Sequence, residues 1–205
     1  MGFRERYSRL GWRYERIAGP LERAFDPLRR KATSFVSGKV LEIGVGTGLM
    51  LPYYPPDVEL HAVDAVPEMV EAARKRAREL GLNARFYVMD AERLEFPDES
   101  FDTVVSPFVF CTIPNPERAM KELYRVLKPG GRAIFLEHTK SDSRLLNWLF
   151  LKPLDVFLGF LLNDNTLRET HRLVERYFRI EHAESHYHGI LRLIVGRKEK
   201  TFKVG

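Results

Sequence analysis

The chain of 205 residues has one cysteine, Cys111, and no glutamine. A single cysteine excludes an intrachain disulfide framework. No apolar segment follows the basic N-terminal start, so the sequence predicts no secretory signal. We therefore expect a protein of the reducing cytoplasm. Charged residues make up 30% of the chain, and this balance without glutamine favours a thermophilic source.

The sequence also lacks a segment suited to cross a membrane. The most apolar stretch, residues 145–162, is interrupted by Lys152, Pro153 and Asp155, whereas a spanning helix needs about 18 or more apolar residues in a row. Its large side chains favour a lid over a lipophilic acceptor, which we place at residues 143–170. A buried helix pair is the alternative.

The net charge of +5 is concentrated in residues 1–38, which hold nine Arg and Lys against four acids, so the remainder is formally neutral. Gly19-Pro20 divides this segment into two predicted helices with aromatic residues among the arginines. It predicts a helical cap that lies on an anionic membrane surface as a peripheral element. A helix packed on the core is the alternative. No sequence-reading module accompanies the charge, which disfavours a nucleic acid partner.

A glycine-rich stretch is the feature around which the chain is organised. The apolar run from Val40 to Ile43 leads into Gly44, Gly46 and Gly48, which indicates a buried strand that enters a tight loop and then a helix. Neither a dinucleotide fingerprint nor the Gly-Lys-Ser/Thr ending of a phosphate-binding loop is present. Glu42 would repel phosphates but suits a ligand that carries an amino group and a sulfonium.

From Lys39 onward, strands and helices alternate as in a doubly wound parallel sheet. Asp64 follows Gly44 by 20 residues, where such folds place an acid that binds ribose hydroxyls. Asp90 ends a later strand and could accept the amino hydrogens of adenine. The predicted strands are Val40–Ile43, Val58–Val63, Ala84–Met89, Phe101–Ser106 and Gly131–Leu136, with helices from Pro67 to Gly81 and from Glu117 to Leu127.

In this order, over residues 39–138, these motifs resemble the class I S-adenosylmethionine-dependent methyltransferases, whose first motif has the E-x-G-x-G-x-G form. The resemblance implies an α/β fold: a Rossmann-like, doubly wound, seven-stranded sheet that is mostly parallel with an antiparallel last strand. It implies a methyltransferase domain at 39–205 after the N-terminal helical cap at 1–38. The cofactor would be S-adenosyl-L-methionine, bound by Tyr14, Glu42, Gly44, Gly46, Thr47, Gly48, Asp64, Ala65, Met69, Asp90, Ala91 and Ser106.

Three short segments narrow the resemblance. Phe110-Cys111-Thr112, Leu136-Glu137-His138 and Asn165 with Thr166–Glu169 are similar to segments of bacterial phosphatidylethanolamine N-methyltransferases and animal membrane-associated alkyl-thiol S-methyltransferases. The predicted acceptor-binding residues are Phe108, Cys111, His138, Asn165 and Arg168. His138 is the candidate general base, needed only if the acceptor arrives protonated; satisfaction of a backbone group is the alternative. We expect Cys111 to be buried rather than nucleophilic.

The histidines His182, His186 and His188 form a cluster in the sequence, and the last two would share a face of a strand. A zinc site would need at least one more ligand, so we expect no metal. The function predicted first is methylation of a lipophilic or membrane-presented acceptor, with a phospholipid amine favoured. Alternatives are a small-molecule methyltransferase acting on a thiol or quinone-like ring, an RNA methyltransferase, or a cofactor-binding protein without turnover. The oligomeric state is left open.

Overall fold

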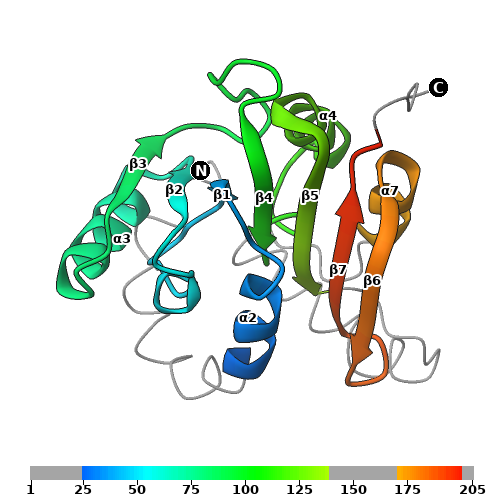
Figure 1. Ribbon diagram of the computed structural model, residues 1–205, viewed down its shortest axis with the longest axis horizontal. Helices are drawn as coiled ribbons and strands as arrows, with labels where there is room; N and C mark the ends of the chain where they lie inside the picture. Colours follow the sequence, from blue (N-terminus) through cyan, green and yellow to red (C-terminus); the bar gives the residue numbers. More distant parts are fainter. Residues whose placement is uncertain (1–24, 139–169, 200–205) are drawn as a thin grey trace.

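The computed structural model describes residues 25–138 and 170–199 of the chain (Figure 1). The predicted cap up to residue 24, with Tyr14, lies outside the described residues. So does nearly all of the predicted lid, with Asn165 and Arg168. Within the described ranges, no helix is long and apolar enough to cross a bilayer.

A seven-stranded sheet forms the centre of the molecule, in the order β3-β2-β1-β4-β5-β7-β6. Strand β7 runs antiparallel to both of its neighbours, and the other pairings are parallel. This confirms the predicted mixed sheet with its antiparallel last strand. The strands are β1 (Lys39–Ile43), β2 (Glu59–Asp64), β3 (Ala84–Val88), β4 (Phe101–Pro107), β5 (Leu127–His138), β6 (Arg179–His186) and β7 (Leu191–Arg197).

Helices cover both faces of the sheet, which explains why its central strands are apolar without alternation. In β1, four of the five residues are buried. The sheet separates two apolar clusters. One contains Leu28, Ala32, Ala73 and Ala77, and the other contains the core residues of α4 (Pro116–Val126) and α7 (Thr170–Tyr177). Figure 1 shows these layers. The helical elements are α2 (Asp26–Thr33), η2 (Leu51–Tyr53), α3 (Pro67–Glu79), α4 (Pro116–Val126) and α7 (Thr170–Tyr177).

Local sequence signals determine where the two long helices, α3 and α4, begin and end. Pro67 begins α3, and Gly81 follows its end with φ +65°. The side chain of Asn115 caps α4 by accepting a hydrogen bond from the Arg118 N–H at 3.0 Å. Both helices therefore lie within two residues of their predicted bounds.

The fifth strand differs from its prediction. It was expected to begin at Gly131 after a turn, but β5 begins at Leu127, directly after α4. Leu127 pairs with Phe101 of β4, and the register shifts before Thr103 pairs with Arg132. The glycines at 130 and 131 thus mark an irregularity within a paired strand rather than the turn before it.

Candidate functional site

The glycine loop after β1 lies at the carboxyl edge of the sheet, where open α/β sheets bind ligands. Gly44 and Gly46 both have positive φ, at +65° and +54°. A Cβ added to Gly44 would overlap the side chain of Val109, whereas one added to Gly46 would meet no atom of the described residues within 4 Å. Gly44 is therefore required by packing, and Gly46 borders open space that a bound molecule could occupy.

Asp64, at the end of β2, holds this loop. Its Oδ2 accepts a hydrogen bond from the Gly46 N–H and its Oδ1 one from the Val66 N–H, each at 2.9 Å. Burial raises the pKa of the Asp64 carboxyl, and the backbone hydrogen bonds partly offset that effect. A carboxylate offers about four acceptor positions, so Asp64 can still accept from a ribose hydroxyl. Its contact with the loop is a second role that the sequence did not indicate.

Glu42 points into the interior from β1. Its side chain is fully buried, and neither carboxylate oxygen has a hydrogen-bond partner among the described residues. The buried Tyr54 hydroxyl lies close enough to Glu42 to affect its pKa, but its geometry is not that of a hydrogen bond to any described residue. Burial raises the pKa of Glu42 to about 8, while Tyr54 and Arg29 act in the opposite direction. An unpaired buried carboxyl group is costly, so a ligand that brings a positive charge would relieve it.

Asp90 follows β3, the strand next to β2, and lines a small cavity of about 150 Å³ with Ala65, Met89 and Arg93. Its Oδ1 accepts a hydrogen bond from the Glu92 N–H at 2.9 Å. Asp64 pairs in register with Val88, two residues before Asp90. The two predicted cofactor acids therefore lie at the carboxyl ends of adjacent strands, Asp64 as the last residue of β2 and Asp90 two residues beyond β3. Of the other predicted residues, Thr47 and Gly48 lie in the glycine loop after β1, Ala91 follows Asp90, and Met69 is buried in the first turn of α3.

The loop after β4 is tied to the end of β5. Ser106, predicted to bind the cofactor, is fully buried and donates its hydroxyl hydrogen bond to Glu137 Oε1 at 2.9 Å. The same oxygen accepts hydrogen bonds from the Val109 and Phe110 N–H groups, both at 3.3 Å. Glu137 is thus the contact of Ser106 that sequence reasoning missed. The available signal was an acid at the carboxyl end of a central strand.

Three aromatic rings meet at this edge. The ring centroid of Phe108 lies 4.7 Å from that of His138 and 5.6 Å from that of Phe25, and the Phe25 and His138 centroids are 6.0 Å apart. The rings come from the start of α2, the loop after β4 and the end of β5. We call Phe25, Phe108 and His138 the aromatic wall. It contains two predicted acceptor residues and adds Phe25, which the sequence did not single out.

Two other predicted residues have structural contacts nearby. Cys111 is buried, as expected, and its Sγ donates to the Phe108 carbonyl oxygen at 3.5 Å. Glu137 and His138 are consecutive in a strand and point to opposite faces. Glu137 therefore contacts the loop after β4, whereas His138 joins the aromatic wall on the α2 side.

The C-terminal histidines correct one prediction. His186 and His188 do not share a strand face, because β6 ends at His186 and His188 lies in the following turn with φ +56°. His182 and His186 instead flank Glu184, which also forms an ion pair with Lys31 of α2. These contacts, Lys31 first, lower the pKa of Glu184 to about 2. No group of three His, Cys, Asp or Glu side chains suited to a metal ion occurs in the described part of the chain.

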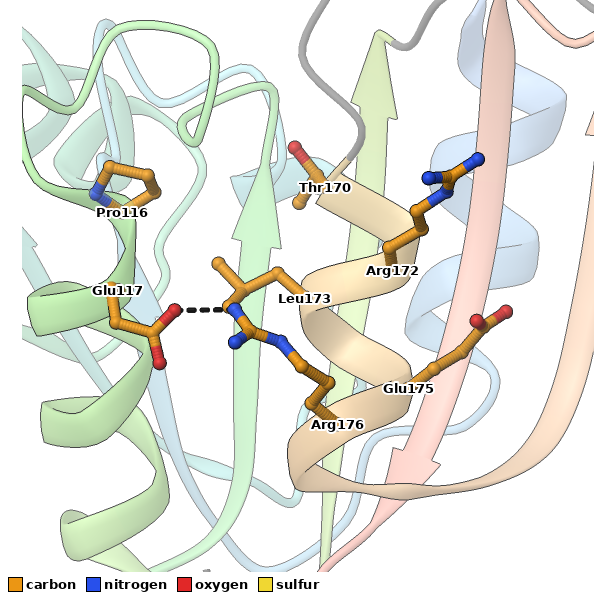
Figure 2. A pocket seen from close by; sticks show the side chains of 7 residues that line it. All are labelled: Pro116, Glu117, Thr170, Arg172, Leu173, Glu175 and Arg176. Carbon is orange, nitrogen blue, oxygen red and sulfur yellow. Dashed lines mark hydrogen bonds and ion pairs between the residues drawn. The ribbon is translucent and has the colours of Figure 1, made fainter. Parts of the chain in front are cut away.

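A larger hollow of about 650 Å³ lies elsewhere, between the start of α4 and α7 (Figure 2). Arg176 reaches across it to an ion pair with Glu117, and Thr170 stands at its upper end. No predicted cofactor residue lines it. We therefore locate the candidate site at the glycine loop and the aromatic wall.

Comparisons with known proteins identify the family of the chain. A family described as methyltransferase domain matches residues 41–135. Phosphatidylethanolamine N-methyltransferase of Cereibacter sphaeroides is 42% identical over 120 residues, covering 56% of this chain and 59% of the relative. Demethylmenaquinone methyltransferase of Thermus thermophilus is 37% identical over 147 residues, 67% of each chain. Human thiol S-methyltransferase TMT1A is 31% identical over 167 residues, covering 79% of this chain and 68% of the relative.

The fold has solved counterparts as well. The crystal structure of an S-adenosylmethionine-dependent methyltransferase of Thermotoga maritima, described as a possible histamine N-methyltransferase, aligns with a TM-score of 0.72 and 27% identity. The alignment covers 95% of this chain and 99% of that one. The fold and these relatives thus define the class of methyltransferases that use S-adenosylmethionine. This chain belongs to the methyltransferase-domain family.

The residues present suit that methyl donor. In the described part of the chain, the Glu42 carboxyl group has no hydrogen-bond partner, and the donor carries an amino group and a sulfonium. Gly46 leaves space beside the loop. Asp64 and Asp90 end the strands that would face the ribose and the adenine. The donor supplies an electrophilic methyl group when bound; these residues would hold and orient it.

Proposed function

We propose that this protein transfers a methyl group to a lipophilic or membrane-presented acceptor, with a phospholipid amine favoured. The supporting observation is the aromatic wall beside the glycine loop. Its rings present apolar surface at the edge where the acceptor must approach, as ligand pockets commonly do. The relative from Cereibacter sphaeroides, named for a phospholipid amine substrate, supports the same acceptor.

The chain's own residues account for the steps this reaction needs. Methyl transfer from a sulfonium is an in-line displacement, so the protein must align two molecules and exclude water. Glu42 and Asp64 would orient the donor, and Phe25 and Phe108 would exclude water on the acceptor side. His138 would receive the proton of an acceptor that arrives as an ammonium.

A small thiol or a quinone-like ring is the second candidate acceptor. The position of His138 at the rim favours a thiol, since a thiol must lose its proton to react. The aromatic wall favours a ring through stacking. The human and Thermus thermophilus relatives are named for substrates of these two kinds. The basic segment at residues 1–38 remains our proposed contact with an anionic membrane surface.

The test is a methyl-transfer assay with isotope-labelled donor, read by mass spectrometry of the extracted products. Vesicles containing phosphatidylethanolamine, an alkyl thiol and a short-chain quinol are offered separately. We expect labelled N-methylated lipid, and less of it with Asp64→Ala than with the exposed control Asp57→Ala. Product from the thiol or the quinol alone would replace the lipid proposal with the second candidate. No labelled product from any acceptor would contradict both.

A further inference from the structure

The unusual feature beyond the donor site is the convergence on Glu137. One of its oxygens accepts from the Ser106 hydroxyl at 2.9 Å and from two consecutive N–H groups, those of Val109 and Phe110, at 3.3 Å. The side chain is fully buried. Hydrogen bonds to a charged acceptor are stronger than neutral ones, and a buried site strengthens them further. Glu137 therefore fixes the backbone that leaves β4.

That backbone has an uncommon conformation. Phe108 has φ +57°, in the left-handed region that bulky residues seldom adopt. Its N–H donates to the Leu136 carbonyl oxygen at 2.7 Å. Such a conformation persists only where the surroundings impose it. Two acceptors supply that constraint: the Leu136 carbonyl binds the Phe108 N–H, and the Glu137 carboxylate binds the N–H groups of the next two residues.

The fixed loop touches both halves of the candidate site. On one side, the Val109 side chain packs where a Cβ on Gly44 would stand, so it abuts the glycine loop. On the other side, the Phe108 ring lies against His138 and Phe25 in the aromatic wall. A displacement of residues 108–110 would therefore shift the wall relative to the donor loop.

We propose that Glu137 is a positioning residue that sets the distance between the donor loop at Gly44 and the acceptor wall at Phe108. It acts through the backbone of residues 108–110 and does not touch the reacting atoms. This role rests on the proposed methyl transfer, because it concerns how donor and acceptor are aligned. An error of about 1 Å in such alignment can cost roughly 100-fold in rate.

The test compares Glu137→Gln, which keeps an acceptor oxygen of the same shape, with Glu137→Ala, which removes it. Nuclear magnetic resonance follows the Val109 and Phe110 amide protons and the His138 ring proton, whose shift reports the stacked Phe108 ring. We expect Glu137→Ala to move all three signals and to lower kcat by about 100-fold with a smaller change in the acceptor KM. Glu137→Gln should restore most of the kcat and the His138 signal.

Ser106→Ala serves as the second variant, because it removes one of the three hydrogen bonds and keeps the carboxylate. It should move the same signals and lower kcat by smaller amounts than Glu137→Ala. It therefore tests the proposal even if Glu137→Ala does not fold. The proposal would be overturned if the His138 and amide signals did not move in folded Glu137→Ala. If that variant does not fold, the same result in Ser106→Ala would overturn it. So would equal losses in the Gln and Ala variants. The resonance measurement needs no acceptor, so it tests the positioning role independently of the activity assay. Absence of methyl transfer by the wild-type protein would refute only the proposed function.

Discussion

Two buried carboxyl groups at the carboxyl edge of the sheet have opposite surroundings. Glu137, at the end of β5, receives three hydrogen bonds on one oxygen, whereas Glu42, in β1, receives none on either oxygen from residues 25–138 and 170–199. Both side chains are fully buried. A carboxylate whose donors come from its own chain stabilises local structure, and one without donors stands ready for a ligand. In the proposed site, the fold would therefore build the acceptor side, while binding of the donor would complete the other.

The largest effect should come from removing each carboxyl group in turn. Glu137→Ala should lower the free energy of unfolding by several kcal/mol, at about 1–3 kcal/mol for each buried donor that it leaves without an acceptor. Glu42→Gln should raise it near pH 8, because the substitution removes a buried group that would otherwise ionise there. Urea unfolding of both variants at pH 8 measures this. A loss of similar size in Glu42→Gln would remove the distinction between the two groups.

The pH dependence of stability sharpens the comparison. The pKa of Glu42 is about 8 in the folded protein against 4.5 as a reference. Between these values the folded state holds a proton that the unfolded state has lost, so stability should fall as pH rises from 4.5 to 8. At about 1.4 kcal/mol per pKa unit, Glu42 should contribute a decrease on the order of a few kcal/mol.

Glu42→Gln provides the matched control for this decrease. The difference in unfolding free energy between the wild type and Glu42→Gln should widen across that interval and level off above about pH 8. Chemical denaturation at several pH values follows it. A difference that does not change with pH would mean that Glu42 is ionised in the folded protein throughout.

A smaller effect separates the packed and open sides of the glycine loop. Gly44→Ala adds a methyl group that overlaps Val109, and Gly46→Ala adds one that meets nothing within 4 Å. Both positions have positive φ, which costs about 1 kcal/mol for alanine. Gly44→Ala should cost roughly 1–3 kcal/mol more from overpacking. Equal thermal midpoints for the two variants would contradict the contact between Val109 and the loop.

The donor side could be predicted from the sequence because its signals are local. Three alternating glycines mark one strand end, and Asp64 and Asp90 mark the ends of the next two strands. Parallel strands bring these ends to one edge, so their order in the chain was sufficient to place them together.

The acceptor side could not be predicted in the same way. The contact between Ser106 and Glu137 joins residues 31 apart, and Phe25 reaches the loop residue Phe108 from the start of α2. Glu137 was noted only as part of a motif with His138, and its direction depended on strand alternation and register. The sequence prediction began β5 too late, because glycines usually signal a turn. In the structure, the pairing with β4 extends to both sides of these glycines.

The central claim is that Glu42 and the glycine loop bind the methyl donor. Calorimetric titration with S-adenosylhomocysteine near pH 7, repeated in buffers of different ionisation enthalpy, tests it most directly. We predict binding that releases a proton from Glu42, because the amino group of the ligand lowers the pKa of that carboxyl. Proton release should vanish in Glu42→Gln, and Asp64→Ala should weaken binding at least about 10-fold, a loss of about 1.4 kcal/mol, while Asp57→Ala binds normally. No binding by the wild type, or binding without proton release, would contradict the account.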